Sequence, residues 1–184
     1  KALEMLKNVN QYQLSKEENT QYIMKLGYAK FMTGDSQGAI EALEEAYKTT
    51  EGSDKNDIAY MLGHLYYADG QNEKAFTFFD QIKENEKYAR VVKPYYVQLY
   101  FNDKDYDKAI VEGNALLNEN ISADYKAEVH KMIGESYFMK GDYSSAYPHL
   151  KIYLESKGTP SESDLYEMGF VSAHLKKYDE AVSY

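Results

Sequence analysis

Four histidines and a few carboxylate pairs are the residues of this sequence that could do chemistry on a substrate or hold a metal ion. The histidines are His64, His130, His149 and His174. No two of them stand three or four residues apart and no His-Glu-x-x-His motif occurs, so we expect no metal site. A carboxylate pair such as Glu44 and Glu45 lies in polar sequence, whereas an acid–base pair needs an apolar pocket that shifts a pKa. A charged, solvated surface is the better interpretation of such pairs.

The sequence also lacks the residues of common catalytic and cofactor sites. It contains no cysteine, and the Gly-Asp-Ser-Gln-Gly segment at residues 34–38 lacks both the Lys-Ser/Thr ending and the preceding strand of a phosphate-binding loop. A Ser, His and Asp trio could arise only through folding, because no such set is ordered along the chain. We therefore predict that the protein is not an enzyme and uses no cofactor and no metal.

Composition indicates a folded chain that does not cross a membrane. Hydrophobic residues fill 43% of the 184 positions. The uninterrupted apolar runs are a few residues long, far below the roughly 20 that a spanning helix needs. Thirty acidic residues against 21 basic ones give a formal net charge of −9, which repels polyphosphate, so nucleic acid is a poor partner. The localisation stays unknown, because cysteine is absent and the segment begins at Lys1, outside any leader peptide.

An alanine recurs at nearly constant spacing at the expected start of a helix, and the five later copies each follow a polar turn. The alanines are Ala2, Ala39, Ala75, Ala109, Ala146 and Ala181. Their separations are 37, 36, 34, 37 and 35 residues. A fixed period of this length is typical of stacked helical repeats, so the elements that position any functional side chain should be helix pairs.

A second landmark stands 12 residues before each of the five later alanines. It is a large apolar residue followed by glycine: Leu26-Gly27, Leu62-Gly63, Ile133-Gly134 and Met168-Gly169, with Tyr96-Val97 in the third repeat. The turns between the landmarks contain Gly34, Gly70 and Gly141, which can adopt a left-handed conformation without steric cost, while Lys104 and Lys176 replace glycine in the other two turns. We expect those two turns to be strained or differently shaped.

These landmarks resemble the signature of the tetratricopeptide repeat, in which Leu-Gly, Tyr, Ala and a large apolar residue recur at these spacings. The resemblance covers essentially the whole chain and implies an all-α, right-handed solenoid of tandem helix-turn-helix repeats. The predicted domain is 1-184, a fragment of a longer array. Within it we expect a truncated repeat at 1-19, full repeats at 20-55, 56-89, 90-126 and 127-161, and a truncated repeat at 162-184.

The repeat pattern predicts eleven main helices, one at the start and two from each of the five later units. Two departures occur in the third repeat. Pro94 is tolerable in a helix only in its first turn, so that first helix is expected to start late or to follow an irregular segment. Val97 stands where glycine is usual and Gly113 where a large residue is usual, and we interpret the two exchanges as compensatory.

In the tetratricopeptide family the inner face of the solenoid is formed mainly by first helices. Carried across by position, the resemblance places these partner-binding candidates there: Met24, Tyr28, Phe31, Tyr60, His64, Tyr67, Phe101, Phe138, Tyr166 and Phe170. Four of them, Phe31, Tyr67, Phe101 and Phe138, could equally be half buried against the next repeat. Tyr28, Tyr60, Tyr166 and Phe170 are expected to be harder to bury. We also expect His130 and His149 to pack within the fourth repeat.

The predicted function is that of a non-enzymatic scaffold. Its aromatic and methionine-rich groove is expected to bind a partner protein through a peptide or helix of that partner. The Tyr-rich, Arg-poor repeats resemble long tetratricopeptide proteins of Bacteroidetes, which implies a periplasmic or outer-membrane-associated role in an envelope or secretion assembly. The alternative is a peptide-sensing regulatory module fused to a signalling or DNA-binding domain. Self-association through truncated ends also stays open, with Leu175, Tyr178 and Val182 expected to pack on a neighbouring molecule or to be poorly ordered.

Overall fold

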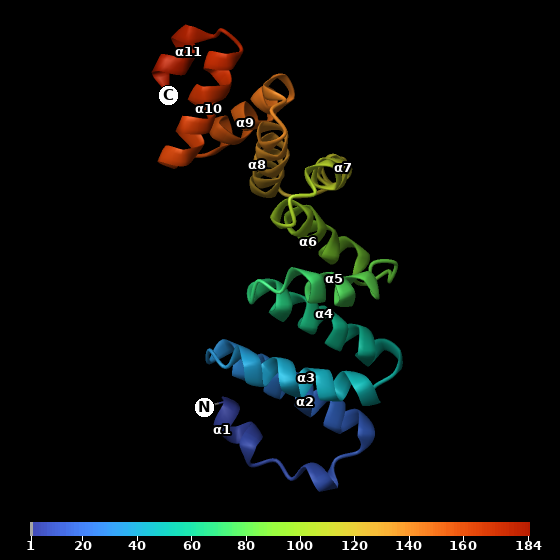
Figure 1. Cartoon of the computed structure of the whole chain (residues 1–184). Helices are drawn as coiled ribbons and strands as arrows, with labels where there is room; N and C mark the ends of the chain where they lie inside the picture. The colour runs from blue at the N-terminus through green and yellow to red at the C-terminus, as the bar shows by residue number, and fades with distance from the viewer. Residues whose placement is uncertain (1) are drawn as a thin grey trace. The chain divides into compact units, whose positions relative to one another are not determined.

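The computed structural model describes residues 2–184 and is entirely helical over that range (Figure 1). It contains eleven α-helices there, which is the number that the repeat pattern predicts. The helices are α1 (Ala2–Lys7), α2 (Lys16–Met32), α3 (Ser36–Thr49), α4 (Gly52–Ala68), α5 (Asn72–Asp80), α6 (Ala89–Asn102), α7 (Tyr106–Leu117), α8 (Ala123–Met139), α9 (Tyr143–Ser156), α10 (Glu162–His174) and α11 (Tyr178–Ser183), with a 3₁₀ helix η1 at Gln11–Gln13. The side chain of the first landmark alanine, Ala2, lies outside the described part of the chain.

The chain divides into two compact units, and their boundary falls inside α6. Unit 1 is Lys1–Val92 and unit 2 is Lys93–Tyr184. In unit 1, α2 packs against α3 and α4 against α5, while α3 also packs against α4. In unit 2, α8 packs against α9 and α10 against α11, while α7 packs on α8 and α9 on α10. Each unit therefore stacks antiparallel helix pairs, as tandem helix-turn-helix repeats do.

A residue in the left-handed conformation ends the first helix of every complete pair. Gly34, Gly70 and Gly141 have φ values of 85°, 73° and 75°, and the two lysines that replace glycine, Lys104 and Lys176, have φ values of 62° and 61°. The N–H of each donates to the carbonyl three residues earlier, and the next N–H donates to the carbonyl five residues earlier. These two bonds define the Schellman motif. The lysine turns thus keep the glycine shape and are strained, which is one of the two outcomes expected.

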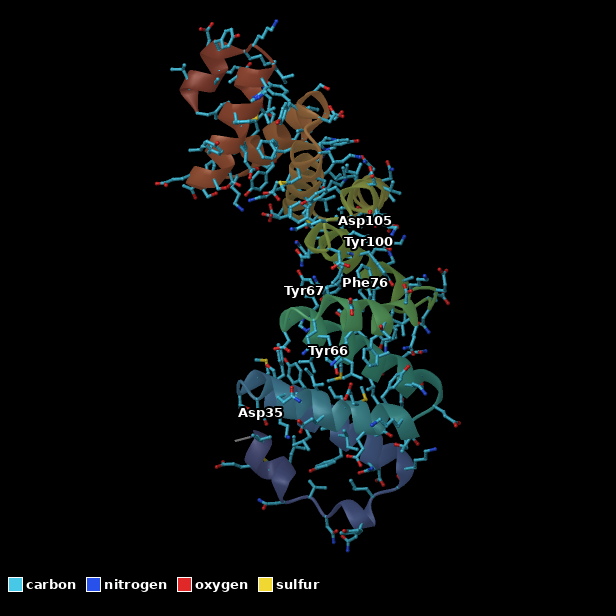
Figure 2. All side chains as sticks on the ribbon, viewed as in Figure 1. Asp35, Tyr66, Tyr67, Phe76, Tyr100 and Asp105 are labelled. Atoms are coloured by element: carbon cyan, nitrogen blue, oxygen red, sulfur yellow. The ribbon has the colours of Figure 1, made fainter. Side chains whose placement is uncertain are left out.

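An aspartate begins the second helix in three of the five pairs. Asp35, Asp105 and Asp142 each accept a hydrogen bond from the backbone N–H three residues later. Figure 2 labels Asp35 and Asp105 at the starts of α3 and α7. The equivalent residues Gln71 and Lys177 make no such bond. The polar turn of the sequence pattern therefore both stops one helix and caps the next.

The landmark glycines of unit 1 make room for the large residue that follows the alanine by four positions. A Cβ atom on Gly27 would lie 2.8 Å from Leu43 Cγ, and one on Gly63 would lie 2.5 Å from Phe79 Cε1. Leu43 and Phe79 are fully buried. The close approach of paired helices therefore depends on a glycine facing a large side chain, and Ala39 is buried beside it.

Unit 2 repeats this arrangement at Gly134 and departs from it in the third repeat. A Cβ on Gly134 would lie 2.8 Å from Leu150 Cδ2. In the third repeat a Cβ on Gly113 would lie 3.6 Å from Val97 Cγ1 and 2.7 Å from Ile133 Cγ1. Val97 is fully buried, so the added bulk of Val97 faces the space left by Gly113, as the compensatory interpretation requires.

The expectation for Pro94 is confirmed in part, because α6 starts late: it begins eight residues before Val97, whereas α2, α4 and α8 each begin 11 residues before their landmark glycine. Pro94 is nevertheless not in the first turn. Helix α6 begins at Ala89, so Pro94 is its sixth residue and lies beyond the first turn. A proline there removes the hydrogen bond that would run back to the carbonyl of Arg90. The missing hydrogen bond lies close in sequence to the boundary between the two compact units, which falls between Val92 and Lys93.

The expectation for Leu175 was also wrong in part. Leu175 is partly buried against the core of its own unit, so it is not a wholly unpacked residue at the end of the chain. Tyr178 and Val182 are exposed, with 63% and 88% of their surface accessible. Whether they meet another molecule stays a prediction.

Candidate protein-binding surfaces

Unit 1 contains an apolar cleft between α1, α2 and α4. Its volume is about 760 Å³, and its lining includes Met5, Leu6, Met24, Tyr28, Met32 and Met61. Tyr28 and Met32 keep 59% and 64% of their surface exposed, so the cleft presents apolar side chains to solvent. Methionine is flexible and polarizable, and such a lining can adapt to partners of different shape.

A smaller hollow of about 190 Å³ continues from that cleft, because Tyr28 and Met61 line both. Phe31, Tyr60 and His64 complete it. The rings of Phe31 and His64 meet edge to face, with centroids 5.9 Å apart. Burial lowers the pKa of His64, so the imidazole is neutral near pH 7 and belongs to an apolar surface.

Tyr60 and Tyr67 are less available than Tyr28. The ring of Tyr60 is half buried and stacks on Tyr88, with centroids 5.3 Å apart, so the expectation that Tyr60 is harder to bury was wrong. Tyr88 is itself held by a hydrogen bond from its hydroxyl to Asp57. Tyr67 is half buried, and burial raises the pKa of its hydroxyl. Tyr28, in contrast, lines both hollows and is exposed to solvent.

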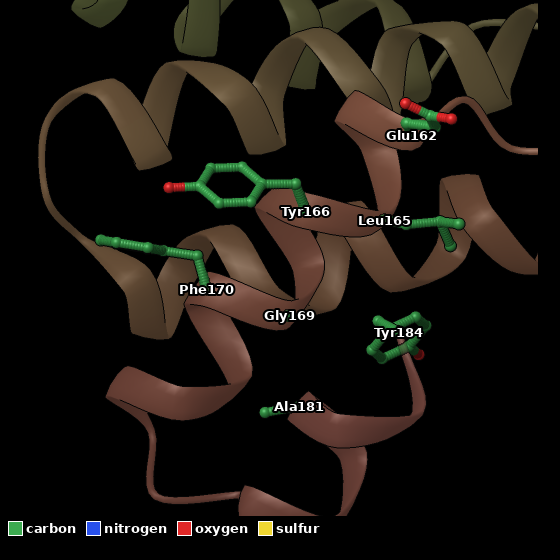
Figure 3. Close-up of a pocket in the computed structure, with 7 residues that line it drawn as sticks. All are labelled: Glu162, Leu165, Tyr166, Gly169, Phe170, Ala181 and Tyr184. Atoms are coloured by element: carbon green, nitrogen blue, oxygen red, sulfur yellow. The ribbon is translucent and has the colours of Figure 1, made fainter.

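Unit 2 has a cluster of aromatic side chains from α8, α9 and α10. Phe138 and Phe170 meet edge to face at 5.5 Å, and Tyr143 contacts Phe170 at 5.6 Å. Tyr166 keeps 67% of its surface exposed, as expected, whereas Phe170 is half buried, contrary to expectation. Figure 3 shows Tyr166 and Phe170 projecting to the same side of α10. Phe101 stands apart, edge to face with Tyr106 at 5.8 Å.

The two aromatic contacts are equivalent within the repeat. Phe31 and Phe138 both lie four residues after a landmark glycine, while His64 and Phe170 directly follow the next one. Each pair therefore joins neighbouring first helices, α2 with α4 and α8 with α10. Phe31 and Phe138 are half buried, so packing between repeats accounts for part of this stripe.

A charged cluster lies on the same first helices of unit 2. Lys131 Nζ lies 2.6 Å from Asp164 Oδ1 and 3.5 Å from Glu135 Oε1. Burial alone would raise the pKa of Asp164, but hydrogen bonds from Lys131 and Ser161 lower it to about 2. Burial and the charge of Glu167 raise the pKa of Glu135 to about 7. Asp164 is thus a permanently ionised partner of Lys131, while Glu135 titrates near neutrality.

His130 and His149 pack together in the fourth repeat, as expected. Their Nδ1 atoms are 2.9 Å apart, so one ring donates to the other and at least one is neutral at that nitrogen. Burial lowers the pKa of both. Across residues 2–184 no group of three or more potential metal-ligating side chains gathers. Over the same range no helix is both long enough and apolar enough to cross a membrane.

The structure brings the sequence-predicted residues together in two sets. Met24, Tyr28, Phe31, Tyr60 and His64 share the unit 1 hollows, and Phe138, Tyr166 and Phe170 share the unit 2 surface. Sequence reasoning missed Met61, as well as Met5 and Leu6 of α1, in the lining of the unit 1 cleft, and it missed Tyr143 beside Phe170 in unit 2. Met61 stands two residues before a landmark glycine and Tyr143 follows a turn, so neither lies at the positions that the family resemblance places on the inner face.

Comparisons with known proteins agree with the helical architecture. A model of the tetratricopeptide repeat matches residues 57–86. A TPR repeat-containing protein of Methanocaldococcus jannaschii is 27% identical over 170 residues, or 88% of this chain. The match spans 29% of that relative's length.

Solved structures resemble the chain in fold. MamA 41-end from Desulfovibrio magneticus RS-1 superposes with a TM-score of 0.74 at 15% identity, covering 89% of each chain. Another MamA structure gives 0.74 at 22% identity, covering 91% of this chain and 88% of that one. Pseudomonas aeruginosa pilF gives 0.67 at 15% identity, covering 92% and 74%. At these identities the likeness concerns the arrangement of helices. The comparisons indicate no catalytic family, and the repeat generally serves to bind proteins or peptides.

Proposed function

We propose that this chain, whose helix pairs resemble tetratricopeptide repeats, is a non-enzymatic scaffold that binds a peptide or helix of a partner protein along its first helices. The cleft of unit 1 carries the proposal, since it holds apolar side chains in contact with solvent. Covering them with a partner's apolar side chains releases water and is favourable. The proposed contact residues are Met24, Tyr28, Phe31, Tyr60, His64 and Tyr67 in unit 1 and Phe101, Phe138, Tyr166 and Phe170 in unit 2.

Tyr28→Ala is the decisive change, because Tyr28 lines both hollows and is exposed. Peptides are selected on the full chain from a random phage-displayed library, and the affinity of the best ones is measured by fluorescence anisotropy. We expect Tyr28→Ala to cost on the order of 1–2 kcal/mol of binding, as is common for an aromatic anchor. Circular dichroism checks that the variant is folded.

Tyr12→Ala is the matched control, since Tyr12 lies on η1 outside both hollows and is 101% exposed. It should leave affinity unchanged. A folded Tyr28→Ala variant that binds every selected peptide as tightly as the original chain would refute the role of the unit 1 cleft.

We further propose that the partner belongs to a bacterial envelope or secretion assembly. The support is the composition of the repeats, with 20 tyrosines and, among 21 basic residues, Arg90 as the sole arginine, which resembles long repeat proteins of Bacteroidetes. A cleavable leader peptide encoded upstream of Lys1 in the gene would agree with this setting. A fused signalling domain in that position would contradict it.

A further inference from the structure

The aromatic surface of unit 2 is bordered by two carboxylates. Glu135 stands three residues before Phe138 on α8, and Glu167 stands three residues before Phe170 on α10. Three residues are close to one helical turn, so each carboxylate lies beside the phenylalanine of its own helix. The two phenylalanines touch, and exposed Tyr166 lies 6.1 Å from Phe170, so all five side chains belong to one surface, here called the α8–α10 surface.

Negative charge on this surface exceeds the positive charge. The cation that faces the carboxylates is Lys131, whose ammonium lies 2.6 Å from buried Asp164 and is also 4.9 Å from the ring of Tyr153. Asp164 holds that ammonium in place and also accepts hydrogen bonds from its own helix start. One ammonium therefore serves three carboxylates, those of Asp164, Glu135 and Glu167, and the cluster carries an excess of two negative charges when all are ionised.

The partly buried carboxylates of Glu135 and Glu167 repel each other when both are ionised. Glu135 keeps 19% of its side-chain surface exposed. Burial and the charge of Glu167 raise the pKa of Glu135, and burial also raises the pKa of Glu167. A second cation placed between them would stabilise both ionised forms. The aromatic faces beside them also attract cations.

We propose that the α8–α10 surface binds a basic segment of a partner protein, with a Lys or Arg side chain between Glu135 and Glu167 and an apolar neighbour on Phe138, Tyr166 and Phe170. The inference rests on the proposed function and adds the charge of the ligand. An acidic segment would be repelled by the same carboxylates, whereas Arg can pair with both and stack on a ring.

Binding of a cation here is linked to proton release. The groups that act on Glu135 are Lys131 on α8 and Asp164 and Glu167 on α10, while Tyr153 on α9 faces Lys131. Burial alone would lower the pKa of Lys131, but the carboxylates of Asp164 and Glu135 outweigh it and raise that pKa, so Lys131 stays charged. Asp164 stays ionised because its pKa is about 2. Glu135, with a pKa of about 7, is the group that changes charge. A basic ligand should therefore bind more tightly at pH 8 than at pH 6.

The test uses a random phage-displayed peptide library on the full chain at physiological ionic strength. The charge variant combines Glu135→Gln with Glu167→Gln, and Glu167→Gln alone is made as a milder form. The ring variant is Tyr166→Ala. The control combines Glu155→Gln with Asp179→Asn, which changes net charge equally at exposed positions of α9 and α11. Circular dichroism checks folding, and the pH comparison needs no variant.

We expect selected peptides to be enriched in Lys and Arg beside apolar residues. A basic peptide from this pool should lose about tenfold in affinity on the charge variant, less on Glu167→Gln, and nothing on the control. Its affinity for the unaltered chain should fall several-fold from pH 8 to pH 6. Equal losses on charge variant and control would overturn the inference, because the field of the whole chain would then be responsible.

The remaining outcomes separate the inference from the proposed function. Apolar peptides without basic enrichment, whose binding needs Tyr166, would overturn the basic anchor and leave the scaffold function standing. Selected peptides that bind the ring variant and the charge variant as tightly as the unaltered chain would overturn both the basic anchor and the scaffold function for this surface. The Tyr28→Ala test of unit 1 does not depend on either result.

Discussion

At the scale of single residues, the landmark glycines determine how closely each helix pair can pack. A Cβ on Gly134 would lie 2.8 Å from Leu150 Cδ2 and 3.1 Å from its backbone nitrogen, and a backbone atom cannot turn away as a side chain can. We therefore expect Gly134→Leu to lower the free energy of unfolding by roughly 1–3 kcal/mol, measured by urea denaturation. Gly158→Leu is the control, because a Cβ there meets nothing within 4 Å, and it should be nearly neutral. An unchanged urea midpoint for Gly134→Leu would show that α8 and α9 do not pack through this residue.

At the scale of elements, the turns inside the helix pairs can be compared with one another. All share the Schellman hydrogen bonds, but Lys104 and Lys176 adopt a left-handed φ that costs a non-glycine residue roughly 1–2 kcal/mol. Glycine removes this strain while adding roughly 0.5–1 kcal/mol of unfolded-chain entropy. Lys104→Gly and Lys176→Gly should each stabilise the chain by roughly 0.5–1 kcal/mol in thermal unfolding, and Gly141→Lys should destabilise it by a similar amount. Lysine-to-glycine variants that melt at or below the original temperature would contradict this account.

The same elements show what the sequence could and could not predict. Glycine, alanine and turn positions were predictable because each solves a local problem that recurs in every repeat. The five positions that precede each landmark glycine or its substitute by five residues are Tyr22, Ile58, Val92, Val129 and Asp164, and all are buried. Nothing in the sequence pattern explains why the last of these positions holds a carboxylate, that of Asp164. Its reason is the ammonium of Lys131, which comes from the preceding repeat and is visible only after folding. The unit 1 cleft was missed in part for the same reason, since Met61 reaches it from a neighbouring helix.

At the scale of the whole molecule, a local packing defect should destabilise the compact unit that contains it more than the other unit. Helix pairs in a repeat array are stabilised by their own packing and by their nearest neighbours, and no distant core compensates for a lost contact. The boundary lies within α6, next to Pro94, where the helix lacks a hydrogen bond. A defect at Gly134 should therefore open unit 2 first. Hydrogen–deuterium exchange of Gly134→Leu should show faster exchange in α8 and α9, while amides of α2 to α5 keep their original rates under native conditions. Equal acceleration in both units would mean that the chain unfolds as one cooperative block and that the boundary in α6 has no energetic meaning.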